Sequence, residues 1–171
     1  LNIQDYVSVN FLAVADVVDL LGGIDLDLTD EEVVHMNNYC VETSKVTGAD
    51  YTKIEPEVAG TYHLNGVQAV SYSRIRYTGG GDFERTSRQR HVLELIAEKA
   101  QSASFSTLNK IIDKVFPQVS TNFTIAEMIA YAKNIAKYKL GDSMGFPDNN
   151  SFDMLDVVGS VVIPETLTSN V

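Results

Sequence analysis

The arginines of this chain all lie in one short segment. The sequence has 171 residues, and its five arginines fall between positions 74 and 90. Two acidic residues share that segment, so its formal charge is 5 − 2, or +3, whereas the whole chain carries −10. A concentration of positive charge on an acidic body favours a focused anion-binding site over a broad surface for polyanions.

The types and spacing of these residues suit the binding of phosphate. An arginine guanidinium is a planar fork that can donate two hydrogen bonds to neighbouring phosphate oxygens. Arg74 and Arg76 are two residues apart and would point to the same side of an extended segment. Arg85, Arg88 and Gln89 have the spacing i, i+3, i+4, which places them on one face of a helix. We therefore predict a phosphate-binding pocket formed by Arg74, Arg76, Arg85, Arg88 and Gln89.

The helix that would carry three of these residues begins near Asp82. Its N-terminal N–H groups would add partial positive charge to the site. Asp82 is a candidate general base, and Arg85 is a candidate for neutralising charge that develops on a leaving phosphate. The competing interpretation of any single arginine is a solvated side chain or an ion pair with a nearby glutamate. It weighs most for Arg88 and Arg90, because one helix cannot direct every side chain inward.

Composition argues against several other classes of protein. An acidic chain is a poor candidate for nucleic-acid binding, which requires a basic face. No stretch approaches about 18 consecutive apolar residues, so we predict no membrane-spanning helix. The first six residues lack the features of a signal peptide. Cys40 is the only cysteine and forms no internal disulfide, and the three histidines lack metal-ligand spacing.

Strands and helices together must position the arginine segment. Residues 24–28 alternate between apolar and acidic side chains, which is typical of a half-buried strand. Capping-box spacings, Thr29 with Glu32 and Thr124 with Glu127, mark the starts of two helices. We predict strands at 6–10, 24–28 and 156–163, helices at 11–21, 29–46, 67–72, 83–100, 107–115 and 124–139, and loops at 47–61 and 78–81. Strands that alternate with helices indicate an α/β layered domain.

The arginine segment is part of a longer signature. Residues 64–77 read LNGVQAVSYSRIRY, and residues 82–90 read DFERTSRQR after a glycine-rich loop. Both runs resemble the signature of the LytR-CpsA-Psr family, approximately LNG-x-QAL-x-Y-x-R-x-R followed by GDF-x-R-x-x-RQ. Upstream, LLGGIDL at residues 20–26 is similar to the family's GGVDV-type strand. The resemblance covers residues 6–100 well and the rest of the chain loosely.

The resemblance implies a membrane-anchored enzyme that acts outside a bacterial cell. Members of the family transfer glycopolymers, including teichoic acid and capsule, from a polyprenyl pyrophosphate carrier to peptidoglycan. The implied fold is an α/β/α layered sandwich with a central mixed sheet, and we expect residues 1–171 to form a single catalytic domain that lacks its N-terminal part. The expected partners are the lipid-linked glycopolymer, peptidoglycan and, through an anchor outside this sequence, the membrane.

The resemblance also assigns the site. In the family, arginines matching Arg74, Arg76 and Arg85, with the glutamine matching Gln89, are associated with the phosphate head group. The aspartate matching Asp82 would serve as a base or orient an arginine. A magnesium ion is implied as well, but its ligands belong to an earlier motif that has no counterpart here. We therefore expect no metal site in this chain, which could be inactive alone.

Two functions compete on this basis. The first is transfer of the glycopolymer, and the alternative is a non-catalytic module that binds a polyprenyl phosphate or an anionic polymer. Early family names suggest a transcriptional regulator or attenuator, but the acidic composition and the lack of a DNA-reading motif disfavour that role. Val67, Val70 and Ile75 are candidates for the wall of a lipid tunnel, although core packing is the favoured interpretation.

Overall fold

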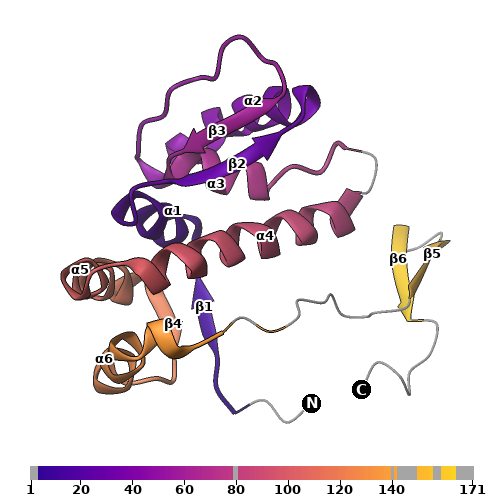
Figure 1. Cartoon of the computed structure of the whole chain (residues 1–171). Helices are drawn as coiled ribbons and strands as arrows, with labels where there is room; N and C mark the ends of the chain where they lie inside the picture. Colours follow the sequence, from indigo (N-terminus) through magenta and orange to yellow (C-terminus); the bar gives the residue numbers. More distant parts are fainter. Residues whose placement is uncertain (1–3, 79–80, 140, 142–149, 156–158, 165–171) are drawn as a thin grey trace. The chain divides into compact units, whose positions relative to one another are not determined.

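The computed structural model describes residues 4–78, 81–139, 141, 150–155 and 159–164 (Figure 1). The chain divides into two compact units, Gln4–Leu140 and a smaller one that contains β5 (Asn150–Leu155) and β6 (Gly159–Pro164). These two strands pair antiparallel, with Asn150 opposite Pro164 and Leu155 opposite Gly159. The expected single catalytic domain over the whole chain stays a prediction.

The larger unit is mostly helical. Its elements are β1 (Val7–Val9), α1 (Phe11–Leu20), β2 (Ile24–Leu28), α2 (Asp30–Thr47), β3 (Gly60–Leu64), α3 (Gly66–Ser73), α4 (Gly81–Ser102), α5 (Phe105–Val115), η1 (Phe116–Gln118), β4 (Val119–Thr121), α6 (Ile125–Lys133) and η2 (Ile135–Lys137). All six predicted helices are confirmed, although the last one stops at Lys133 and a 3-10 turn follows it. The predicted strand at 156–163 overlaps β6, and residues 156–158 lie outside the described part.

The strands correct part of the predicted fold. The mixed α/β class is confirmed, but the described residues form only antiparallel pairs, β1 with β4, β2 with β3 and β5 with β6, and no central mixed sheet. The alternation of strands and helices indicated an α/β layered domain, and the family resemblance implied the central mixed sheet. Instead, residues 48–59 return the chain to the end of β2 from which α2 departs, so that Gly60 pairs with Leu28 and Leu64 with Ile24. β3 therefore runs antiparallel to β2.

The core lies between β2, α2 and α3. Ile24, Leu26 and Leu28 form the buried side of β2, while Asp25 and Asp27 face outward, as the alternation predicts. Apolar side chains of α2 and α3 complete this core, among them Val33, Met36, Cys40, Val67 and Ala69. In Figure 1 the long helix α4 crosses the middle of the unit, with these elements on one side of it and β4 and α6 on the other.

The three candidates for a lipid-tunnel wall are all buried. Val67 and Ile75 belong to the main core, which confirms the favoured interpretation for these two. Val70 is buried as well, but it also borders a small apolar pocket described below. Among the residues that the structure describes, no helix combines the length and the apolar composition that crossing a bilayer requires.

Candidate functional site

Helix α3 brings the first arginines into position. Its N-terminus is a capping box, in which the Asn65 side chain accepts a hydrogen bond from the Gln68 N–H at 3.0 Å and Gln68 Oε1 accepts one from the Asn65 N–H at 2.9 Å. Gln68 Nε2 also donates to the Thr52 carbonyl at 2.8 Å. Arg74 is the C-terminal cap of this buried helix, so the packing of α3 fixes the point where the arginine segment begins.

A pocket of about 320 Å³ lies where this segment meets α4. It is lined by three arginines, a glutamine and three aromatic side chains: Arg74, Arg76, Arg85, Gln89, Phe11, Tyr39 and Tyr77. The sequence spacing thus predicted a real convergence of four polar side chains. Their role as phosphate ligands stays a prediction.

Arg74 is held rigidly in this pocket. Its Nη1 donates to Thr43 Oγ1 at 3.0 Å, and its Nη2 pairs with Glu42 Oε2 at 2.8 Å. The guanidinium carbon lies 4.8 Å from the centre of the Phe11 ring and 5.4 Å from that of Tyr39, within cation–π range. The side chain is 16% exposed, and these contacts fix the orientation of the guanidinium at the wall of the pocket.

The other predicted site residues differ in their exposure to solvent. Arg76 and Gln89 are exposed, and Arg85 is half-buried. Arg76 lies in the irregular segment after α3, whereas Arg85 and Gln89 lie one helical turn apart on α4. The side chain of Asp82, in the first turn of α4, lies outside the described residues, and its role as a base stays a prediction.

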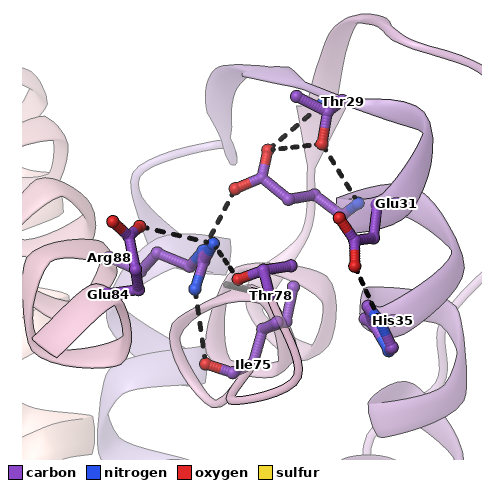
Figure 2. Close-up of polar contacts among 8 residues, drawn as sticks. Thr29, Glu31, His35, Ile75, Thr78, Glu84 and Arg88 are labelled. Atoms are coloured by element: carbon purple, nitrogen blue, oxygen red, sulfur yellow. Dashed lines mark hydrogen bonds and ion pairs between the residues drawn. The ribbon is translucent and has the colours of Figure 1, made fainter. Parts of the chain in front are cut away.

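The structure places Arg88 away from this pocket. Its side chain is 6% exposed and forms an ion pair with Glu32 of α2, Nε to Oε1 at 3.0 Å. It also donates to Thr78 Oγ1 at 2.6 Å and to the Ile75 carbonyl at 3.4 Å, and it lies 3.6 Å from Glu84 (Figure 2). This buried network ties α4 to α2 and to the arginine segment.

Helical geometry explains the difference between neighbours in sequence. At about 100° per residue, Arg85 and Gln89 lie about 40° apart around the α4 axis, while Arg88 lies about 60° from Arg85 on the opposite side. That offset turns Arg88 toward α2, and the pocket keeps Arg85 and Gln89. The i, i+3, i+4 spacing therefore predicted one arginine too many for the pocket. Arg88 instead holds α4 to α2 through its ion pair with Glu32.

Burial changes the acidity of Tyr72, whose ring lies under Arg88 at 5.8 Å from the guanidinium carbon. Removal from water raises the pKa of the Tyr72 hydroxyl to about 12, and the negative charge of Glu32 adds to the shift, while Arg88 opposes it. The unfolded chain has a tyrosine pKa near 10. The folded state thus holds this proton more tightly than the unfolded state does.

We expect this proton to make folding sensitive to alkali. The stabilisation that comes from the protonated Tyr72 hydroxyl is complete below pH 10 and is lost as the pH rises through about 12. At about 1.4 kcal/mol per pKa unit, the loss is on the order of 3 kcal/mol of the free energy of unfolding. Denaturant unfolding of the parent and of Tyr72→Phe across that interval measures it. The phenylalanine variant should lose less stability than the parent over the same pH range, and identical slopes would contradict the assignment.

An apolar pocket of about 240 Å³ adjoins the arginine pocket. The two share Phe11 and Gln89, and the apolar one is lined mainly by aliphatic side chains, including Val14, Val70, Val92 and Leu93. Of these apolar and aromatic lining residues, only Val70 was predicted from the sequence as a candidate wall residue. Phe11 and Tyr39 belong to helices α1 and α2, where they are indistinguishable from ordinary core positions in the pattern.

Comparison with known proteins places this geometry in a family. The model of the LytR_cpsA_psr family matches residues 1–153. The chain belongs to the LytR-CpsA-Psr family. The match includes both arginine-bearing motifs and every residue that lines the arginine pocket, so this membership confirms the resemblance seen in the sequence.

Several relatives within the LytR-CpsA-Psr family are named as transferases. The polyisoprenyl-teichoic acid–peptidoglycan teichoic acid transferase TagV of Bacillus subtilis is 32% identical over 130 residues, which cover 75% of this chain and 30% of TagV. The transferase TagU of Enterococcus faecalis is 34% identical over 128 residues, covering 74% of this chain and 36% of TagU. The chain thus spans about a third of the length of these relatives.

Solved structures of the LytR-CpsA-Psr family agree with the fold. The crystal structure of B. subtilis TagV is 26% identical, with a TM-score of 0.65 over 99% of this chain and 60% of the TagV chain. A structure of TagT bound to LIIa-WTA is 25% identical, with a TM-score of 0.54 over 78% of this chain and 45% of the TagT chain. The likeness extends over nearly the whole chain in the first case.

Proposed function

We propose that this chain belongs to an enzyme that transfers an anionic glycopolymer, such as teichoic acid or capsule, from a polyprenyl pyrophosphate carrier to peptidoglycan. The observation that carries the proposal is the pocket in which Arg74, Arg76, Arg85 and Gln89 meet beside an apolar pocket. A ligand with a pyrophosphate head and an apolar tail would find both environments in contact. The names of the relatives TagV and TagU support transfer over binding alone.

In the proposed reaction, a hydroxyl oxygen of peptidoglycan attacks the phosphorus atom that bears the glycopolymer. A new P–O bond forms to that oxygen, the bond to the bridging oxygen breaks, and polyprenyl phosphate leaves. The hydroxyl proton passes to a base, for which Asp82 is the candidate. Arg74, Arg76 and Arg85 would neutralise the charge that grows on the phosphate oxygens, and charge placed in advance costs no reorganisation during the reaction.

The role of magnesium stays an expectation from the resemblance. Among the described residues, no three histidine, cysteine, aspartate or glutamate side chains lie together in a way that could hold a metal ion. The described part of the chain does not itself fit such an ion, and the steps above use only its own side chains. The proposal also includes an extracytoplasmic, membrane-anchored location, because the acceptor polymer lies outside the cell membrane.

The decisive measurement is the affinity for polyprenyl pyrophosphate in Arg76→Ala and Arg85→Ala. Each substitution should weaken binding about tenfold or more, because a charge-assisted hydrogen bond to phosphate contributes roughly 1.5–3 kcal/mol. Arg85→Lys should recover part of the loss, since an ammonium keeps the charge without the planar fork. The matched control is Arg90→Ala, which removes the same charge from α4 but does not line the pocket.

Two results would count against the proposal. If both alanine variants bind the lipid as tightly as the parent and Arg90→Ala, the pocket does not bind the pyrophosphate. If binding depends on the arginines but the intact protein, given magnesium, lipid-linked glycopolymer and peptidoglycan, forms no covalent product, the chain belongs to the non-catalytic alternative.

A further inference from the structure

A second, differently built pocket shares a wall with the arginine pocket. It has a volume of about 270 Å³ and is lined by His35, Asn38, Tyr39, Glu42 and Tyr77. Tyr39 and Tyr77 also line the arginine pocket, so the two pockets adjoin at these aromatic side chains. Groups bound in the two pockets would therefore contact the same two tyrosines.

Aromatic rings form one wall of this second pocket. The centres of the Tyr39 and Tyr77 rings are 6.4 Å apart with 27° between their planes, and the His35 ring lies 5.9 Å from that of Tyr77. Tyr77 is 73% exposed, so much of its ring is open to a ligand. The face of an aromatic ring is negative and attracts the weakly positive C–H groups of an apolar surface laid against it.

The polar part of the pocket suits hydroxyl groups rather than phosphate. Asn38 offers an amide that both donates and accepts hydrogen bonds. Glu42 accepts a bond from Arg74 through Oε2, and a carboxylate has capacity for several more. Among the residues that the structure describes, no arginine or lysine lines this pocket, and a carboxylate would repel a second phosphate, whereas hydroxyls can donate to it.

A pyranose ring combines the two surfaces that this pocket recognises, since it has an apolar C–H face and a rim of hydroxyl groups. We infer that the pocket of His35, Asn38, Tyr39, Glu42 and Tyr77 is a sugar subsite, occupied by the pyranose attached to the pyrophosphate of the lipid-linked donor. The inference rests on the proposed function, because the shared tyrosines place this sugar next to the pyrophosphate. On this inference, the pocket determines which first sugar of the donor the protein accepts.

The test compares three probes: bare polyprenyl pyrophosphate, the same lipid carrying one N-acetylhexosamine, and a soluble peptidoglycan disaccharide-peptide. The parent should bind the sugar-bearing lipid about tenfold more tightly than the bare lipid, the increment expected from one stacked ring and one or two hydrogen bonds. Asn38→Ala, which alters a residue of the second pocket alone, should remove much of that increment and leave the affinity for the bare lipid within about twofold. Tyr77→Ala should also remove the increment, and because Tyr77 lines both pockets its affinity for the bare lipid is the reference for that variant. Tyr77→Phe keeps the ring and should retain most of the increment.

Two further variants sharpen the measurement. Tyr6→Ala removes an exposed tyrosine that lines neither pocket, and it should behave as the parent. The chain contains no tryptophan, so Tyr77→Trp places a single indole fluorophore at the proposed stacking surface. Its emission should change when the sugar-bearing lipid is added, by more than with the bare lipid.

The three probes distinguish the ways in which the inference could fail. Equal affinity of the parent for the bare and the sugar-bearing lipid would overturn the sugar subsite while leaving the pyrophosphate site intact. Dependence on Tyr77 and Asn38 for the peptidoglycan fragment alone would assign the pocket to the acceptor and overturn the donor assignment. Failure of the parent to bind even the bare lipid would overturn the proposed function, and this inference with it.

Discussion

Replacing Arg88 with alanine should lower the free energy of unfolding by about 3–5 kcal/mol, because the substitution leaves a buried carboxylate without its partner. Glu32, the partner, is only 14% exposed, and the pair is reinforced by the bond from Arg88 to Thr78. Denaturant unfolding of the two proteins measures the difference. Arg90→Ala, two residues further along the same helix, should change stability by no more than about 0.5 kcal/mol.

A paired substitution separates the lost charge from the lost packing. Arg88→Met with Glu32→Gln removes both charges, keeps much of the buried volume and leaves a residue that can still serve the capping box at Thr29. This double variant should be clearly more stable than Arg88→Ala alone. If Arg88→Ala costs less than about 1 kcal/mol, the network does not hold α4 to α2 in the way described.

Gly66→Ala should lower the free energy of unfolding by about 3 kcal/mol. A β-carbon at Gly66 would overlap the carbonyl oxygen of Ala15 and lie 2.6 Å from its carbonyl carbon, so the backbones of α1 and α3 would have to separate. The Gly66 N–H, which donates to Asp19 Oδ1 at 2.7 Å, would lose its alignment at the same time. Thermal or denaturant unfolding measures the cost.

A second glycine provides the control. At Gly60, in β3, the nearest atom to an added β-carbon is 3.5 Å away on the Tyr62 ring, an ordinary contact. Gly60→Ala should therefore stay close to the parent in stability. Gly66→Ala should also weaken lipid binding, because α1 supplies Phe11 and α3 supplies Arg74 to the same pocket. Equal stability of the two variants would show that α1 and α3 can separate at little cost.

The sequence predicted those features that depend on neighbours along the chain. Capping boxes at Thr29 and Thr124 located two helix starts, and each is present in the structure. Alternation at 24–28 identified the buried side of β2 correctly. The four pocket residues Arg74, Arg76, Arg85 and Gln89 were predicted from spacing, because they lie within one continuous segment.

What the sequence could not supply was pairing over long distances. β3 and β4 are short, and their partners, β2 and β1, lie far away in the chain, so neither the antiparallel pairing nor its register leaves a local signal. The direction of the Arg88 side chain also depends on a distant residue, because its partner Glu32 lies 56 residues earlier. Tyr39 reaches the pocket from α2 for reasons of tertiary packing alone.

The two oxygens of Glu32 have separate tasks, and this division links distant parts of the fold. Oε2 caps α2 by accepting bonds from the N–H and hydroxyl of Thr29, at 3.1 and 3.2 Å, while Oε1 binds Arg88 of α4. Fraying of the first turn of α2 must therefore loosen α4, and release of α4 must weaken the cap, so the two open as one cooperative unit. Any ligand that holds Arg85 and Gln89 will, by the same coupling, slow hydrogen exchange at the start of α2.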